Sequence, residues 1–152
     1  MKHFTARWGG IVLALAYLTI PARADTPGRH PAYLHALSDL RYARALLNRP
    51  DEVRVVRDQR AAIDLIDKAI YELKNASYDD RKNPEDHAPI DAHWLRAGRI
   101  HRSIEMLNRA LHDVEKEEDN PAARGWRNSA IGYMRDAAAF AEKALRDEHH
   151  FE

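Results

Sequence analysis

Apolar residues recur at spacings of three and four along four stretches of the chain, which is the period of an amphipathic helix. The pattern predicts helices over residues 31–47, 90–118 and 121–148, and a further helix that begins between residues 51 and 58 and ends before Tyr78. Pro31 and Pro121 suit a first helical turn, where the missing N–H of proline is not needed. The charged, proline-containing stretch 78–89 is the longest predicted loop.

Each predicted helix has one apolar side, which is expected to face a common core. These predicted core residues are Tyr33, Leu37, Leu40, Ala43 and Leu47; Ala62, Ile63, Ile66, Ala69, Ile70, Leu73 and Ala76; Ala97, Ile100, Ile104, Leu107, Leu111 and Val114; and Trp126, Ala130, Tyr133, Met134, Ala137, Phe140, Ala141, Ala144 and Leu145. A shift of 68 residues sets the alanines of the second helix on those of the fourth. Four such helices with short connections pack most simply as an all-α, up-down-up-down four-helix bundle.

The first 24 residues have the layout of a signal peptide. A basic start is followed by an apolar run over residues 8–20 and by Ala22-Arg23-Ala24, a small-x-small cleavage site. The run holds 13 residues, whereas a membrane-spanning helix needs about 20. We therefore expect cleavage after Ala24, a flexible lead-in over residues 25–30, a bundle over 31–148 and a tail over 149–152. The mature protein is expected to be periplasmic or secreted, without a membrane span.

Composition excludes several kinds of function. The chain has 24 basic and 24 acidic residues, and the predicted signal peptide removes three basic ones, so the mature chain carries a net charge of about −3. Such a balanced surface disfavours nucleic-acid binding, which usually needs a basic face. The absence of cysteine excludes a lipid-modified cysteine, covalent haem attachment, thiol catalysis and cysteine-based zinc sites.

Three blocks of sequence resemble a known group of proteins. They are HPAYLHALSDLRYAR (30–44), IDLIDKAIYELKNASYDDRKNPEDHAPID (63–91) and VEKEEDN (114–120). They are similar to a group of small exported bacterial four-helix proteins of unknown function. The resemblance implies the fold, and it implies no activity, cofactor or catalytic residue.

Histidines and carboxylates form the main candidate site. In an up-down-up-down bundle, the start of the first helix, the loop after the second and the end of the fourth share one pole. Six histidines would gather there, and imidazoles beside carboxylates are ligands for zinc, copper or nickel. The candidate metal ligands are His30, His35, Asp86, His87, Asp91 and His93.

Other chemistries have less support in the sequence. His101, Glu105, Asn108 and His112 form a polar stripe on the third helix, which is interpreted as a solvated flank. The chain contains no Glu-x-x-His pair for a di-iron site and no G-x-S-x-G or H-E-x-x-H motif. We therefore expect a non-catalytic protein without a cofactor, which acts as an interaction or structural module of the cell envelope. The alternative is transition-metal binding or buffering at the histidine pole.

Overall fold

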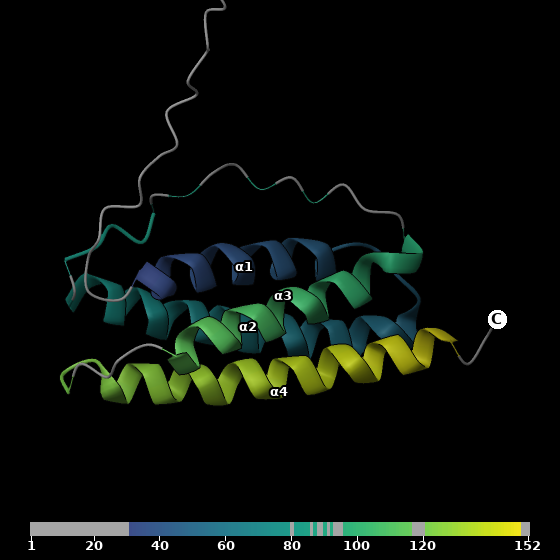
Figure 1. Ribbon diagram of the computed structural model, residues 1–152. Helices are drawn as coiled ribbons and strands as arrows, with labels where there is room; N and C mark the ends of the chain where they lie inside the picture. The colour runs from purple at the N-terminus through teal and green to yellow at the C-terminus, as the bar shows by residue number, and fades with distance from the viewer. Residues whose placement is uncertain are drawn as a thin grey trace, which may run out of the picture.

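The computed structural model describes residues 31–79, 81–85, 87, 90, 92, 96–116 and 121–149. These residues form four helices and no strand (Figure 1). The helices are α1 (Pro31–Leu47), α2 (Val53–Asp79), α3 (Arg96–Lys116) and α4 (Arg124–His149). The predicted all-α, four-helix architecture is confirmed. The predicted signal peptide and lead-in lie outside the described residues.

Two helix starts differ from the prediction. Ile90 and Ala92 are not helical, and α3 begins at Arg96 instead of Ile90. Residues 121–123 form a turn, and α4 begins at Arg124 instead of Pro121. The end of α2 has a left-handed residue: Arg81 has a φ of 59°, and the Lys82 N–H donates to the Ser77 carbonyl at 2.9 Å, as in a Schellman cap.

The order of the helices in space differs from the predicted up-down-up-down order. α1 packs against α2 and α3, and α4 packs against α2 and α3, while α2 and α3 lie on a diagonal without contact. Arg99, near the start of α3, is paired with Asp51, which precedes the start of α2. α2 and α3 therefore run in the same direction, and Figure 1 shows that α2 ends at one end of the bundle and α3 begins at the other. The bundle is up-down-down-up, with one long crossover connection.

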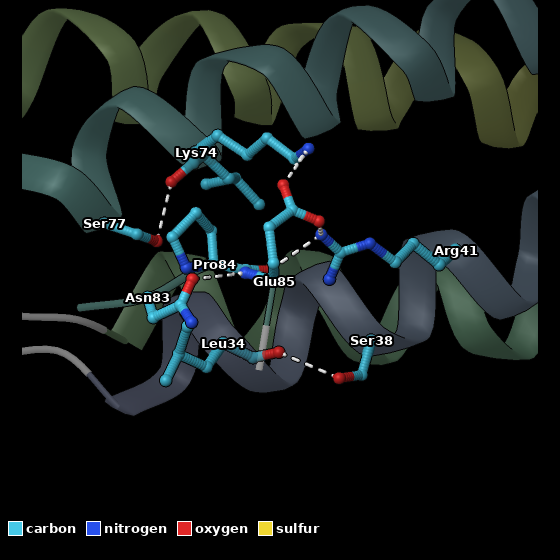
Figure 2. A network of polar contacts seen from close by, with 9 residues as sticks. Leu34, Ser38, Arg41, Lys74, Ser77, Asn83, Pro84 and Glu85 are labelled. Atoms are coloured by element: carbon cyan, nitrogen blue, oxygen red, sulfur yellow. Dashed lines mark hydrogen bonds and ion pairs between the residues drawn. The ribbon is translucent and has the colours of Figure 1, made fainter. Parts of the chain in front are cut away.

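The length of the connection explains this difference. Residues 80–95 can extend over roughly 50 Å, which exceeds the ~40 Å length of α2, so the chain is able to return to the end from which α2 began. Polar contacts hold the first part of the connection in place (Figure 2). The Glu85 carboxylate contacts Lys74 of α2 and Arg41 of α1, and Arg41 also donates to the Pro84 carbonyl at 2.7 Å.

Buried alanines recur along both α2 and α4. α2 and α4 pack against each other, and the alanines that the 68-residue shift matches are fully buried on both helices. These residues are Ala62, Ala69 and Ala76 of α2 and Ala130, Ala137 and Ala144 of α4. Small side chains let two helices approach closely, and the larger Ile66, Leu73 and Met134 fill the spaces between them.

Two of the three predicted core aromatics of α4, Trp126 and Phe140, are not in the core, whereas Tyr133 packs against it. Trp126 is 36% exposed and Phe140 is 37% exposed, and Tyr133 is half-buried under the ammonium of Lys68, which lies 5.8 Å from the ring centre. The buried alanines explain this correction. Ala130, Ala137 and Ala144 are fully buried on the inner side of α4, whereas Trp126 and Phe140 lie on the flank of the helix.

Candidate functional site

The chain path divides the predicted histidine pole. α1 starts at one end of the bundle, whereas α3 starts and α4 finishes at the other end, where Arg99 meets Asp51 and Lys143 meets Asp58. The argument that gathered six histidines at one pole is therefore wrong. It relied on a short connection between the second and third helices, and that connection is the crossover.

The candidate metal ligands themselves are placed only in part. His35 lies on the exposed side of α1, and His87 lies exposed in the connection between α2 and α3. His30, Asp86, Asp91 and His93 lie outside the described residues. Within the described part of the chain, no three His, Asp or Glu side chains come together as a group that could hold a metal ion. Metal binding by the six ligands stays a prediction.

The polar stripe of α3 is solvated, as predicted. His101, Glu105, Asn108 and His112 are all exposed. The His101 Nε2 lies 3.3 Å from the Glu105 carboxylate, which also accepts a hydrogen bond from Arg102 at 2.6 Å. The bond from Arg102 is the main reason that the pKa of Glu105 lies below its ordinary value. The stripe contains surface ion pairs and has no access to the core.

Three buried carboxylates join helices that are far apart in sequence. Asp39 of α1 is held by Arg109 of α3, and Asp58 of α2 accepts from Lys143 of α4 at 2.6 Å. These contacts, and the Asp51 pair described above, leave each carboxylate neutralised by a specific cation. A buried charge is tolerated when it is paired in this way. The role of the three pairs in holding the helices together is therefore enough to explain why these carboxylates are buried.

Asp51 has the most enclosed of these sites. Its side chain is 0% exposed and that of Arg99 is 8% exposed, with 2.6 Å between Oδ2 and Nη2. Gln59 donates to the same Oδ2 at 3.0 Å, and the Glu52 N–H donates to Oδ1 at 3.1 Å. The network fastens the α1–α2 turn to the first turns of α2 and α3.

A groove opens on the outer side of this network. It has a volume of about 1180 Å³ and lies between the start of α2 and the end of α4. We call it the end groove, and its lining residues are Asp51, Val53, Arg54, Val56, Arg57, Arg60, Ala61, Asp64 and Asp147. A smaller hollow of about 290 Å³ shares Asp51, Val56 and Arg60 with it and includes Arg49.

The end groove combines exposed apolar surface with guanidinium groups. Val53 is 90% exposed, and the side chain of Arg57 is 79% exposed although its Nε lies 3.7 Å from Asp58. Because α2 has 3.6 residues per turn, Arg54, Arg57 and Arg60 follow one another along the side of the helix. Such a surface can bind carboxylates through paired N–H donors.

Sequence reasoning did not identify the end groove. The sequence feature nearest to the groove is the group of β-branched valines within residues 53–56. These valines made the predicted start of the second helix uncertain. In the structure α2 begins at Val53, and the first valine is turned to the outside. An exposed valine among arginines at a helix start would have been the feature to look for.

No protein-family model, curated protein or solved structure matches this chain. The resemblance to exported bacterial four-helix proteins therefore stays a prediction. Of the helices in the described residues, none combines the length and the apolar character that a bilayer span requires.

Proposed function

We propose that this protein is exported and acts without catalysis, by binding a protein partner of the cell envelope through the end groove. The observation that carries the proposal is the groove itself. It is open to solvent, it has the fully accessible Val53 at its edge, and it is rich in arginine. Arginine and apolar side chains together are the usual composition of protein-binding surfaces.

Charge indicates which partner would fit. Arg49, Arg54, Arg57 and Arg60 lie on the groove and the hollow beside it, whereas the Asp51 carboxylate is occupied by Arg99 and Gln59. With Asp51 paired to Arg99, these four arginines face only the carboxylates of Asp64 and Asp147 on the lining, so the groove and the hollow together are locally basic. The partner that best complements it is a polypeptide segment with acidic and apolar side chains.

The absence of catalysis is part of the proposal. It is supported by the pairing of the buried Asp39, Asp51 and Asp58 with cations. A catalytic acid or base must be able to exchange a proton with a substrate, and each of these three carboxylates is instead held by a cation.

Photo-crosslinking in the intact cell tests the proposal. A photoreactive amino acid is introduced at Val53 and, as a control, at Tyr78, which is exposed at the end of α2, at the other end of the bundle. We expect one protein adduct from position 53 and none from position 78. Arg57→Glu should abolish the adduct because it reverses a charge in the groove, while Lys116→Glu, an exposed charge reversal at the end of α3, should not.

Three results would contradict the proposal. They are a lack of any adduct at position 53, an adduct that survives Arg57→Glu, and an adduct with lipid only. Export has a separate readout: the mass of the protein recovered from the cell envelope should correspond to loss of residues 1–24. Recovery of the full-length chain from the cytoplasm would contradict that part of the proposal.

A further inference from the structure

The chain continues past α4 from the edge of the end groove. α4 ends at His149, and Asp147, in its last turn, lines the groove. Residues 150–152, which follow α4 with the sequence His-Phe-Glu, lie outside the described residues. Figure 1 shows that the end of α4 and the start of α2 lie at the same end of the bundle. The segment 150–152 therefore begins at the groove.

One ion pair sets the level at which α4 ends. Asp58 of α2 accepts from Lys143 of α4 at 2.6 Å, and these two helices run in opposite directions. His149 is six residues beyond Lys143, and Val53 is five residues before Asp58, so α4 ends level with the start of α2. Three residues extend over roughly 10 Å, which is about the length of two helical turns. A segment that turns back over the groove therefore reaches the first two turns of α2.

The apolar part of the groove is matched by Phe151. Val53 is 90% exposed, and Val56, which also lines the groove, is half-buried. A ring placed over these two side chains removes apolar surface from water. Phe151 is the large apolar residue of the segment, and it is close enough to α4 to reach them.

Arg57 supplies the charge that matches Glu152. Its side chain is 79% exposed, and within the described residues its ion-pair partner is Asp58, whose carboxylate lies 3.7 Å from the Arg57 Nε. That carboxylate already accepts from Lys143 at 2.6 Å. The planar guanidinium of Arg57 therefore keeps N–H donors for a second carboxylate.

The lining as a whole is basic once the Asp51 pair is set aside. It holds Arg54, Arg57 and Arg60 against the carboxylates of Asp64 and Asp147. Arg60 is exposed, and it has no ion pair within the described part of the chain. One further carboxylate is therefore attracted to the groove.

We infer that residues 150–152 turn back from the end of α4 and occupy the end groove, with the Phe151 ring on Val53 and the Glu152 carboxylate on Arg57. So short a tether gives an effective concentration on the order of millimolar, so a weak contact is enough to fill the groove. The segment has the acidic and apolar composition that we expect of the partner, and it competes with the partner for the same surface. This last step rests on the proposed function, whereas the docking of the segment does not.

Photo-crosslinking of the purified full-length chain tests the docking. A photoreactive phenylalanine analogue replaces Phe151, and mass spectrometry locates the residue to which it becomes linked. We expect a link to residues 53–57 of the same chain, which a mixture of unlabelled and isotope-labelled protein distinguishes from a link between copies. Arg57→Glu should lower the yield at least about threefold, because it turns an attraction into a repulsion. Lys116→Glu, an exposed charge reversal at the end of α3, should leave the yield unchanged.

A charge exchange separates docking from simple proximity. Glu152→Lys should lower the yield as Arg57→Glu does. The two substitutions together should restore most of it, since the pair then forms again with its charges exchanged. The inference is overturned if Arg57→Glu leaves the yield unchanged, if the double variant stays low, or if the link forms only between copies.

Competition with the partner has its own readout in the cell. Phe151→Ala with Glu152→Ala should raise the adduct between position 53 and the partner at least about threefold, because the tethered competitor is lost. Phe140→Ala with Glu142→Ala, at exposed positions of α4, should not raise it. An unchanged partner adduct in the first variant would overturn the competition. The absence of any partner adduct would contradict the proposed function, and the link within the purified chain would still decide the docking.

Discussion

Removal of Arg99 is expected to destabilise the bundle strongly. In Arg99→Met the side-chain volume is nearly kept, but the Asp51 carboxylate, which is 0% exposed, loses its cation and keeps only the hydrogen bonds from Gln59 and the Glu52 N–H. Breaking a buried pair on one side costs about 3–5 kcal/mol. A domain of this size has only about 5–15 kcal/mol of total stability, so the change is a large share of it.

Urea unfolding of three further variants makes this test specific. Arg135→Met removes an ion pair with Glu115 in which both side chains are exposed, and it should cost at most about 1 kcal/mol. Asp51→Asn combined with Arg99→Met should recover at least about 2 kcal/mol relative to Arg99→Met, because the amide keeps an acceptor for Gln59 without a buried charge. Asp51→Asn alone completes the double-mutant cycle. The reasoning is refuted if Arg99→Met costs no more than Arg135→Met, or if the double variant is as unstable as Arg99→Met.

Two further predictions concern the connection and the metal hypothesis. The hydrogen bond from Lys74 lowers the pKa of Glu85 below the ordinary 4.5, so the anchor of the connection should be complete above about pH 5 and lost as the pH falls through and below 4.5. In the wild type, hydrogen exchange should show that amides of the connection lose protection as the pH falls. In Glu85→Gln these amides should lack protection both above pH 5 and below 4.5. Calorimetry with zinc should show only millimolar binding, and the double variant His87→Ala, His93→Ala should not change it, since α1 and α3 start at opposite ends of the bundle. Micromolar zinc binding that the double variant abolishes would instead support the metal hypothesis.

Local features of the sequence predicted much of the fold. The apolar period placed all four helices, and Pro31 marked the start of α1. The alanines at matching positions of α2 and α4 were predicted as core residues, and they are buried on both helices. Patterns of this kind are encoded within one or two helical turns, so they can be read without knowing the rest of the structure.

The chain path could not be read in the same way. It depends on pairs such as Asp51 with Arg99 and Asp39 with Arg109, whose partners are 48 and 70 residues apart. In the sequence these residues look like ordinary surface charges among 24 basic and 24 acidic ones. The up-down-up-down prediction also assumed that the chain takes the shortest route after α2, which the connection does not do.

The grouping of the candidate ligands at one pole depended on the same assumption about the chain path, and metal binding by these residues stays a prediction. His35 and His87 were exposed, as histidines near helix ends often are, but their grouping was deduced from topology and from no local motif. Conversely, Trp126 and Phe140 were assigned to the core because they share a helix side with alanines. Only the structure shows that the alanines fill the contact and that the rings lie outside it.

The path of the chain determines where the end groove lies and at which end of the bundle each helix begins. A distance measurement between pairs of spin labels tests it most directly, with labels at the exposed positions Val53 and Tyr78 of α2 and His101 of α3. Val53 and Tyr78 are separated by roughly 37 Å along the helix. The up-down-down-up path predicts that the distance from 53 to 101 is much shorter than the distance from 78 to 101. The opposite order would contradict it.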